Sequence, residues 1–395
     1  MTVAEALTAL APARRSAIVS TPPALGVVPA RDVTAGERLP AWARATVDGY
    51  AVRAADTSAA AETLPSFLEV TGAVAMGRVP DGEVGPGAAM EIPTGGLLPH
   101  GADAVVMVEH TTAPMPGLVE VLRGVAPGEG VLQPGEEAEP GEALAPAGRA
   151  LRAADLGLLA SAGITRIDAC ARPRVGIVST GDEVVPAGTA EPSPAQVRDA
   201  CAPALAGLVR EAGGDPVLRG IVPDDAAEIE HVLADAVAHD DVVVVSAGSS
   251  VGARDLTATV VARLGEVVCH GLALKPGKPT LLADCDGVPL IGLPGNPRSA
   301  LVVFRLVGVP LVRRVAGIVA PPVAATVQAE LARDVPSAAG RLDVVQVTVG
   351  DGVATPRFGS SALLGPMVGA DGWFRVPEPA TGLGAGTVVD VELYG

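Results

Sequence analysis

The chain has 395 residues, of which 49% are hydrophobic and 2% aromatic, and its formal net charge at pH 7 is −17. This length predicts two or three domains, and the large apolar share argues against global disorder. An acidic chain repels polyanions, so the composition also argues against nucleic-acid binding. A small anion is still a plausible ligand, because an acidic protein can contain a local cationic pocket.

The chain lacks the usual marks of secretion, membrane insertion and cysteine-bound metal. Residues 1–10 have no basic start and no apolar core. The most apolar stretch, 301–323, is interrupted by prolines and arginines and cannot supply the roughly 18 apolar residues of a membrane span. The four cysteines show no C-x-x-C spacing, so we expect small buried residues in a reducing compartment. These features predict a soluble cytoplasmic protein without a membrane partner.

The first 165 residues predict helices on either side of a β-rich module. Residues 1–30 have the pattern of a helix that ends at Pro22 and Pro23. Between 40 and 140, short apolar runs alternate with Gly/Pro clusters, which is typical of short strands and turns. The runs are Phe67–Val70, Ala104–Val108 and Leu118–Leu122. Residues 151–165 show helical periodicity, and we expect this helix to pack on the N-terminal one.

From Arg174 onward, apolar strands alternate with amphipathic helices. The expected strands are Val175–Ser179, Val217–Val222 and Asp241–Ser246, and the expected helices are Gln196–Ala212 and Asp224–Ala238. This alternation predicts a parallel sheet with both faces covered. Ligands in such sheets bind beyond the carboxyl ends of the strands. Three polar segments follow predicted strands: Thr180–Glu183, Ser246–Asp255 and Gly292–Pro297.

A proline pair at 321–322 marks a linker, and short strands with Gly-rich turns follow it. The expected strands are Ala324–Leu331, Leu342–Val349 and Thr387–Leu393. The predicted fold class is therefore multidomain α/β plus β modules. We expect a helical N-terminal and linker domain (1–40 and 141–170), an inserted β-rich domain (41–140), a central parallel α/β domain (171–318) and a C-terminal β-barrel-like domain (319–395).

Only two lysines occur in the chain, Lys275 and Lys278, although arginine is common. They lie three residues apart in the segment LKPGKP. A compact ammonium binds a tetrahedral oxyanion as a point charge, unlike the planar guanidinium. The prolines and Gly277 would stiffen the turn and let its backbone approach a ligand. This pattern predicts an oxyanion site, although an ordinary surface turn would show the same residues.

The single asparagine, Asn296, lies in a Gly/Pro-rich loop before an apolar helix predicted over Ala300–Val309. Such a loop aims backbone N–H groups and a helix N-terminus at one point, which suits phosphate. Ser246–Gly252 also offers hydroxyls and amides, but it lacks the spacing of a P-loop. Both loops are also compatible with simple turns.

Five acidic residues are candidates for binding a divalent cation: Asp48, Asp182, Glu183, Asp224 and Asp255. Carboxylates near phosphate-binding loops are common Mg²⁺ ligands, although a single carboxylate of this kind more often caps a helix or is a solvated charge. The five histidines form no H-E-x-x-H pattern, and no G-x-S-x-G segment is present. The sequence therefore gives little support to zinc hydrolysis or a serine nucleophile.

Taken together, these segments resemble the molybdopterin molybdenumtransferase family, called MoeA in bacteria and the E domain of gephyrin in animals. The similar segments are TVDGYAV (46–52), IPTG (92–95), PHGADAVV (99–106) with Glu109, STGDE (179–183), SVGARD (250–255), KPGKP (275–279) and GLPGNP (292–297). They follow one another in the family's order along nearly the whole chain. Each is weak alone, but the ordered set is highly specific.

The resemblance implies the final step of molybdenum-cofactor biosynthesis. Such an enzyme inserts molybdenum from molybdate into adenylylated molybdopterin and releases AMP, with Mg²⁺ or another divalent cation as cofactor. The resemblance also implies a molybdopterin-binding-like central domain and a homodimer with sites between subunits. Expected protein partners are the adenylylating protein and the recipient molybdoenzymes.

The same resemblance suggests roles for particular residues. Catalytic roles fall on Asp48, Glu183 and Asp255, and Asp255 with Asp224 would bind the metal. The residues expected at molybdate are Lys275, Lys278, Ser250, Arg341 and Ser360. The residues expected at the pterin nucleotide are Thr94, Thr180, Gly181, Asp182, Gly248, Gly252, Pro294, Gly295 and Asn296.

Departures from the family pattern keep two other hypotheses open. The segment Gly130–Glu137 lacks the arginines that are usual there, Cys201 replaces an asparagine, and 247–250 reads AGSS in place of GGVS. These changes would suit a divergent, non-catalytic pterin- or nucleotide-binding paralogue or scaffold. A nucleotide-binding regulator built on a bare α/β domain is the other hypothesis, and the DGYA segment at Asp48 argues against it.

Overall fold

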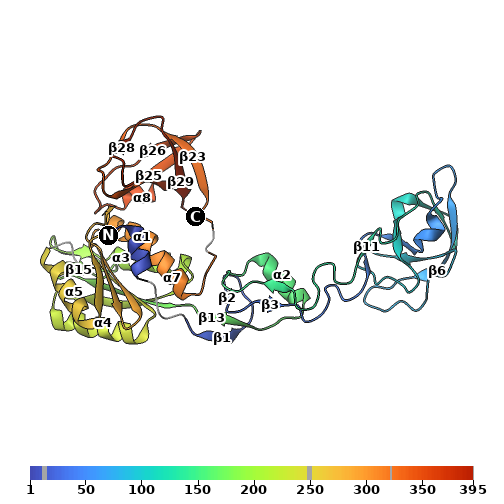
Figure 1. Cartoon of the computed structure of the whole chain (residues 1–395), viewed down its shortest axis with the longest axis horizontal. Helices are drawn as coiled ribbons and strands as arrows, with labels where there is room; N and C mark the ends of the chain where they lie inside the picture. The colour runs from blue at the N-terminus through green and yellow to red at the C-terminus, as the bar shows by residue number, and fades with distance from the viewer. Residues whose placement is uncertain (11–15, 247–250, 321–322, 395) are drawn as a thin grey trace. The chain divides into compact units, whose positions relative to one another are not determined.

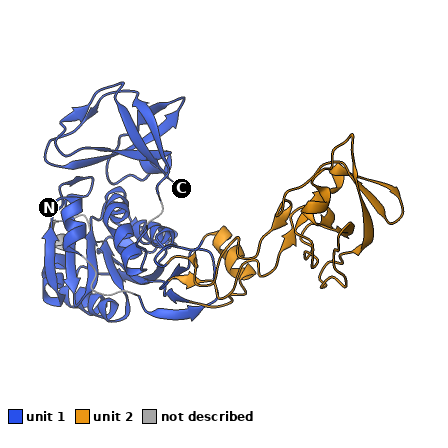
Figure 2. Ribbon diagram, turned by 45° about the vertical axis from the view of Figure 1, so that its right-hand side comes forward, with its two compact units in different colours: residues 1–31, 147–151, 168–395 blue, residues 32–146, 152–167 orange. Residues whose placement is uncertain are grey.

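The computed structural model describes residues 1–10, 16–246, 251–320 and 323–394, and the side chains of all of these except 251–255. The chain forms two compact units (Figure 2). The first contains residues 1–31, 147–151 and 168–395, and the second contains residues 32–146 and 152–167. Each unit is described by itself.

The first unit is built around a mixed sheet, shown in Figure 1. Its strands, in spatial order, are β17 (Asp215–Val222), β14 (Arg174–Thr180), β18 (Val242–Ser246), β22 (Val288–Leu293), β21 (Leu281–Cys285) and β19 (Glu266–His270). The strands from β17 to β22 run parallel, whereas β21 pairs antiparallel with both of its neighbours, β22 and β19. The expected parallel sheet is therefore correct for its first four strands only.

A tight turn explains the antiparallel edge. Cys285 of β21 pairs with Val288 of β22, which leaves Asp286 and Gly287 as the two turn residues. Both have positive φ, 53° and 84°. An Asp-Gly pair with this geometry forms a two-residue hairpin turn, and a hairpin joins antiparallel strands.

Alternation along β18 divides the apolar side chains between two cores. Val242 and Val244 belong to a core with α3 (Cys201–Glu211), α6 (Pro297–Val303) and α7 (Val309–Val315). Val243 and Val245 belong to a core with α4 (Ala226–His239) and α5 (Val251–Leu264). Because strand side chains alternate between faces, a run of four buried valines requires helices on both sides.

The N-terminal helix is shorter than expected and packs elsewhere. The helix α1 covers Val3–Ala9, begins with a capping box between Thr2 and Glu5, and is followed by β1 (Ile18–Thr21). Ala6 and Leu10 are buried in the core of the α/β domain. The expectation of a helix over 1–30 packed on residues 151–165 is therefore wrong. A short amphipathic helix buries its apolar side wherever the larger core lies.

Residues 323–394 form a small closed barrel. Its strands, in order around the ring, are β25 (Leu342–Gly350), β26 (Val353–Pro356), β23 (Thr326–Leu331), β29 (Val388–Leu393) and β27 (Gly372–Val376), and β27 pairs back to β25. Val347, Phe374 and Val391 are buried inside. An extra strand, β20 (Leu274–Lys275), comes from the α/β domain and pairs parallel with β25. The lysine-containing loop is therefore attached to the barrel.

The second unit is rich in strands, as its Gly/Pro-punctuated sequence predicts. Its sheet has the order β8 (Ala104–Met107), β5 (Gly49–Val52), β7 (Ala88–Ile92), β6 (Ser66–Ala73), β10 (Leu118–Val121) and β9 (Thr111–Met115). The unit also contains the strand pairs β11 (Val131–Leu132) with β4 (Arg44–Ala45) and β12 (Ala143–Ala145) with β3 (Val33–Thr34). Its helical segments include α2 (Ala153–Ser161) and short 3₁₀ helices at Ala54–Thr57 and Val108–His110. The α/β plus β-module fold class is thus confirmed.

Among the described residues, no helix combines the length and the apolar character needed to cross a bilayer.

The predicted helix over Gln196–Ala212 begins later, at Cys201, because Val197 and Arg198 form the short strand β16 beside β15 (Val184–Val185). Asp199 then caps α3, and its Oδ1 accepts the N–H groups of Cys201 and Ala202 at 2.9 and 3.0 Å.

Candidate functional site: a cationic cavity beside the lysine loop

The loop that carries both lysines is held rigidly by backbone hydrogen bonds. The Leu342 N–H donates to the Ala273 carbonyl at 2.9 Å, which joins the loop to β25. The Lys278 carbonyl accepts the N–H groups of Leu272 and Thr280, both at 2.9 Å. The Thr280 hydroxyl is buried and donates to the Gly277 carbonyl at 2.6 Å. The backbone between the two lysines therefore has little freedom to move.

Gly277 is the position in this loop that only glycine fits. Its φ is +130°, a conformation that side chains disfavour. A Cβ built there would lie 2.5 Å from Cγ2 of Val303 and 3.0 Å from Cδ2 of Leu274. Because Val303 and Leu274 are both fully buried, the added atom would force the loop away from α6.

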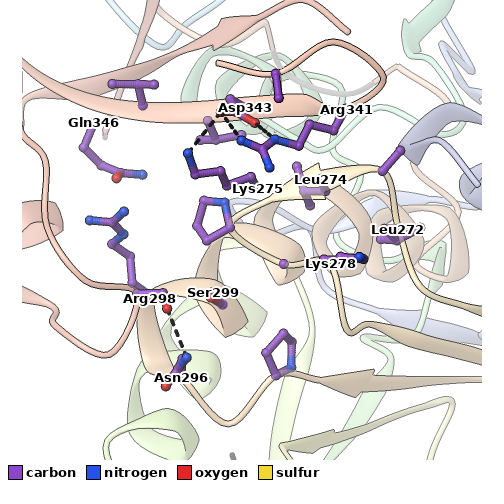
Figure 3. Close-up of a pocket in the computed structure, with 18 of the residues that line it drawn as sticks. Leu272, Leu274, Lys275, Lys278, Asn296, Arg298, Ser299, Arg341, Asp343 and Gln346 are labelled. Atoms are coloured by element: carbon purple, nitrogen blue, oxygen red, sulfur yellow. Dashed lines mark hydrogen bonds and ion pairs between the residues drawn. The ribbon is translucent and has the colours of Figure 1, made fainter. Parts of the chain in front are cut away.

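Lys275 shares one buried carboxylate with Arg341. The Lys275 Nζ lies 3.5 Å from Oδ2 of Asp343, and the Arg341 Nε donates to Oδ1 of Asp343 at 2.8 Å. The Asp343 side chain is only 4% exposed, whereas that of Lys275 is 56% exposed. Asp343 thus anchors the two cations and leaves the lysine open to a ligand, as Figure 3 shows.

These residues line a cavity of about 600 Å³ between the lysine loop, the start of α6 and the barrel. Its ionisable lining residues within the described part of the chain are Lys275, Lys278, Arg298, Arg341, Arg357 and Asp343. Five cationic side chains and a single carboxylate therefore line this cavity, in a protein with a net charge of −17. Such a concentration of charge favours a small anion.

Asn296 connects the α/β domain to the barrel at this cavity. Its Nδ2 donates to the Ser361 hydroxyl at 3.0 Å, and the N–H of Arg298 donates to the Ser361 carbonyl at 3.2 Å. Pro294 lines the same cavity. Gly359 and Ser361 also contribute to the lining, whereas the Ser360 hydroxyl accepts the N–H of Ala362 at 3.3 Å. The asparagine singled out by the sequence therefore joins two domains at the cavity wall.

A second cavity, of about 400 Å³, lies beyond the carboxyl ends of β14 and β18. Its lining includes Thr180, Glu183, Gly295 and Asn296, so Asn296 borders both cavities. The Thr180 hydroxyl is buried and has no hydrogen-bond partner among the described residues. A buried hydroxyl without a partner is unfavourable unless a ligand or water supplies one.

Asp182 and Asp224 lie together at the edge of the sheet. The Asp224 N–H donates to Oδ1 of Asp182 at 3.1 Å. Burial raises the pKa of the Asp224 carboxyl, and the nearby charges of Asp182 and Glu183 raise it further. One Asp224 oxygen is buried and has no hydrogen-bond partner in the described part of the structure. An under-satisfied carboxylate oxygen beside two other acids is suited to a hard divalent cation, although the described residues contain no complete group of three metal-binding side chains.

Asp48 and Thr94, both predicted as site residues, meet within the second unit. The Thr94 backbone N–H and hydroxyl donate to the same Asp48 oxygen at 2.6 and 2.9 Å. These two bonds lower the pKa of Asp48, with the backbone bond as the larger cause. Gly49, the next residue, is held by β-pairing on both sides, and its missing side chain admits the Val106 carbonyl.

Four predicted site residues cannot be placed in detail. Gly248 and Ser250 lie outside the described residues. Gly252 and Asp255 belong to α5, but their side chains are also outside the description. Of the remaining predicted residues, Gly181 has a positive φ of 139° and lies just after β14, next to Asp182.

Several polar and charged residues of the cavity beside the lysine loop were not predicted from the sequence, among them Asp343, Arg298, Arg357 and Gln346. Asp343 and Gln346 are buried polar residues inside an otherwise apolar strand. A polar residue between apolar neighbours in a predicted strand was the signal in the sequence that could have indicated Asp343 and Gln346. Arg298 lies two residues after Asn296, as the second residue of α6. Burial lowers the pKa of its guanidinium.

Comparison with known families assigns each part of the chain. Residues 1–163 match the MoeA N-terminal region (domain I and II), residues 176–314 match a probable molybdopterin binding domain, and residues 328–394 match the MoeA C-terminal region (domain IV). The three matches follow the order of the predicted segments and cover most of the chain.

Curated relatives and solved structures indicate the same family as the three family matches. A molybdopterin molybdenumtransferase of Nostoc sp. is 36% identical over 71% of this chain, and the alignment covers 64% of that relative, slightly under two thirds. Molybdopterin molybdenumtransferase 1 of Mycobacterium tuberculosis is 31% identical over 98% of this chain and 96% of its own length. Two structures of a molybdopterin biosynthesis MoeA protein from Pyrococcus horikoshii each cover the whole of this chain. The first has a TM-score of 0.83 and 36% identity, and 98% of it is covered by this chain. The second has a TM-score of 0.87 and 29% identity, and 100% of it is covered.

The fold and the cavity therefore define a multidomain protein of molybdenum-cofactor biosynthesis, with a molybdopterin-binding α/β domain joined to a small barrel. The chain belongs to the MoeA family, the molybdopterin molybdenumtransferases, and is a transferase.

Proposed function

We propose that this chain transfers molybdenum from molybdate to adenylylated molybdopterin and releases AMP, as the final step of molybdenum-cofactor biosynthesis. The observation that carries the proposal is the cavity, whose lining contains five cationic side chains and one carboxylate. Molybdate is a small tetrahedral dianion, so its charge matches this site, and the cavity of about 600 Å³ leaves room for a larger anionic substrate beside it. The membership of the MoeA family supports the same reaction.

In this proposal Lys275 and Lys278 attract molybdate as point charges. A guanidinium prefers planar, two-point contact, whereas an ammonium accepts any tetrahedral orientation. Asp343 holds Lys275 and Arg341 in place before the anion arrives. The loop therefore does not need to reorganise when molybdate binds, which is the condition for strong electrostatic stabilisation. Ser250 and Ser360 are expected to add hydroxyl contacts.

The smaller cavity would hold the nucleotide. Thr180 offers its unpartnered hydroxyl, and Gly181 and Asp182 follow directly at the end of β14. Gly248, Gly252, Pro294 and Gly295 are expected to approach the pterin nucleotide through their backbones. Because Asn296 borders both cavities, the phosphoanhydride and the molybdate would be held side by side. Such positioning removes much of the entropic cost of bringing two reactants together.

A divalent cation, Mg²⁺ or another, is the proposed cofactor, and Asp224 and Asp255 would hold it, with Glu183 and Asp182 nearby. When bound, such a cation neutralises the charge that develops on a phosphoanhydride during cleavage. The unpartnered Asp224 oxygen and its raised pKa fit this role. The carboxylates of the chain position the cation, and the lysine loop keeps the second anion close.

We further propose that the protein acts as a homodimer, with Asp48 and Thr94 contributed from the second unit of one subunit to the site of the other. Asp48 is kept ionised by Thr94, so it is available to orient a donor of the bound pterin. Cytoplasmic location and contact with the adenylylating protein and recipient molybdoenzymes complete the proposal. Light scattering of the purified protein tests the dimer: a monomer at working concentration would contradict it.

The direct test is AMP release from adenylylated molybdopterin by the purified protein, which should require both molybdate and a divalent cation. Lys275→Ala should raise the molybdate concentration needed for half-maximal rate by about tenfold, the equivalent of one charge-assisted contact. Its affinity for the nucleotide should change little. An unchanged molybdate requirement would show that the lysine assignment is wrong.

A cellular test separates turnover from binding alone. The gene should restore a molybdoenzyme activity in a strain that lacks its own molybdenum insertase. Ligand binding without AMP release, together with failure to restore that activity, would instead indicate a non-catalytic scaffold.

A further inference from the structure

One wall of the cavity beside the lysine loop is formed by two polar side chains to which the proposed function assigns no individual contact. Arg298 is the second residue of α6, and Gln346 lies in the middle of β25. Figure 3 shows the Arg298 guanidinium directed toward the Gln346 amide, with Lys275 on the same side of the cavity. Both residues line the cavity.

Both side chains present buried donors without acceptors. The Nε and Nη1 atoms of Arg298 and the Nε2 atom of Gln346 are inaccessible and have no hydrogen-bond partner in the described part of the chain. Gln346 is only 1% exposed.

An arrangement of this kind is unfavourable in the absence of a ligand. The Arg298 side chain is half-buried, and its two inaccessible nitrogens lose their hydration without gaining a carboxylate or carbonyl acceptor. The nearest carboxylate lining the cavity, Asp343, is already bound to Arg341 and Lys275. Donors that face one another without an acceptor between them are complementary to an anion.

We propose that Arg298 and Gln346 form an oxyanion subsite in this cavity, beside the lysine loop, that binds one end of a tetrahedral oxyanion. The inference rests on the proposed function, since it adds two residues to the same cavity. The oxyanion is either molybdate itself or the phosphate group of the pterin substrate; both present tetrahedral oxygens of the same chemistry. The guanidinium supplies paired donors, and the amide supplies a neutral donor that adds geometric selectivity.

The test measures binding of sodium molybdate and, separately, of inorganic phosphate to the full-length protein by isothermal titration calorimetry. Arg298→Met should weaken the binding of at least one of the two anions about tenfold, and Gln346→Leu should weaken the same anion by a smaller factor. Arg375→Met is the matched control, because Arg375 pairs with Glu392 at 2.7 Å and does not line the cavity. If Arg298→Met weakens the binding of molybdate alone, of phosphate alone or of both, the result identifies which oxyanion binds at the subsite.

A structural role for Arg298 predicts a different result. If Arg298 served only to pack against Gln346, Arg298→Met would lower the thermal midpoint without changing either affinity, and that outcome would overturn the inference. The subsite instead predicts an anion-free midpoint that is equal or higher, because an unpaired buried charge is removed. Should Arg298→Met fail to fold, Arg298→Lys decides: at least threefold weaker binding supports the subsite, and unchanged binding refutes it.

Lys275→Met separates this inference from the proposed function. If Lys275→Met weakens molybdate binding and Arg298→Met leaves both anions unaffected, the subsite is refuted and the proposed function stands. If neither variant changes the binding of either anion, both the lysine assignment and the subsite are wrong.

Discussion

Lys275 and Asp343 lie directly opposite each other where β20 pairs with β25, and the Lys275 Nζ is 3.5 Å from Oδ2 of Asp343. The second oxygen of the carboxylate accepts from Arg341 at 2.8 Å. This pairing brings a loop of the α/β domain and a strand of the barrel together around one buried charge. The position of the cations therefore depends on the contact between the two domains.

Replacing Asp343 with asparagine tests this dependence. Asp343→Asn keeps the shape but leaves Lys275 and Arg341 without their shared counter-charge, so the free energy of unfolding should fall by ~1–2 kcal/mol, discounted because Lys275 is half-exposed. Urea unfolding measures it. Asp390→Asn is the control in the same barrel, because Asp390 is exposed and accepts only from Gln328. An equal loss in both variants would contradict the anchoring role.

Substitution of Gly277 should destabilise the protein for two reasons, its positive φ and its close approach to Val303, and a pair of variants can separate them. Gly277→Ala places a Cβ 2.5 Å from Val303 in a positive-φ backbone, whereas Gly271→Ala shares the positive φ of 114° and meets nothing closer than 3.8 Å. We expect Gly277→Ala to cost ~1–3 kcal/mol more than Gly271→Ala and to raise the molybdate requirement. Chemical unfolding and AMP release measure the two effects. Equal stability losses would show that contact with Val303 is unimportant.

The neighbouring acids Asp224 and Asp225 should have opposite effects on stability. The pKa of Asp224 is raised by burial and by nearby acids, so its folded form holds a proton more tightly than the unfolded chain. The ionised Asp224 carboxylate therefore lowers the free energy of unfolding at pH values above the pKa of the unfolded chain. As the pH falls below that pKa, Asp224 is protonated in both states and the destabilisation disappears. Asp224→Asn should raise the free energy of unfolding at pH 7 by a few tenths to ~1 kcal/mol, while weakening the response to divalent cations.

Asp225 provides the contrast. Its Oδ1 accepts the N–H groups of Ala227 and Glu228 and caps α4 at 2.9 and 3.1 Å. Asp225→Ala should therefore lower the free energy of unfolding by ~0.5–2 kcal/mol. Thermal unfolding at pH 7 distinguishes the two variants by sign, and a destabilised Asp224→Asn would contradict the repulsion inferred at that site.

Asp48 should titrate below the ordinary range for an aspartate, because the Thr94 N–H and hydroxyl favour its charged form. Because the pKa of Asp48 is lower in the folded protein than in the unfolded chain, its ionised form stabilises the fold. This contribution is present above the unfolded pKa and is lost as the pH falls through the folded pKa. Thr94→Val removes the hydroxyl and keeps the backbone N–H, so the pKa of Asp48 should rise part of the way toward normal. Carboxyl NMR titration measures this, and an unchanged pKa would show that the hydroxyl bond is unimportant.

The cysteines should be unequal toward alkylation. Burial, with the charge of Asp199, raises the pKa of Cys201 to about 12, and burial with nearby acids raises that of Cys285 to about 11. At pH 8 almost none of either thiol is ionised, and the thiolate is the reactive form. Cys170 is the more exposed of the four, so mass spectrometry should find it modified first by iodoacetamide. Early modification of Cys201 would contradict its burial.

Local patterns in the sequence correctly predicted much of the architecture. The uninterrupted valines of 242–245 predicted a strand buried on both faces, and the structure covers both faces with helices. The predicted cap at Asp224 and Asp225 is realised by Asp225. Such features depend on residues that are near neighbours in the chain, and their physical cause is contained in the pattern itself.

The candidate site was predictable only in part. The isolation of Lys275 and Lys278 in an arginine-using chain pointed to their loop, and the loop lines the cavity. Asp343 could not be found in the same way, because an acid in a strand has no local sign that it will face a lysine of another domain. The length of the N-terminal helix was also misjudged, since propensity alone does not show where a helix finds its core.

Sequence alone therefore determined the order of the domains, the alternation that covers both faces of the sheet, and the unusual chemistry of the lysine loop, because each follows from the spacing of neighbouring residues. The tertiary structure alone decided that β20 would pair with β25, that Asp343 would anchor two cations, and that the Arg298 and Gln346 donors would share one wall. These relationships arise from strand register and domain packing, which bring distant residues within reach and which no local pattern encodes.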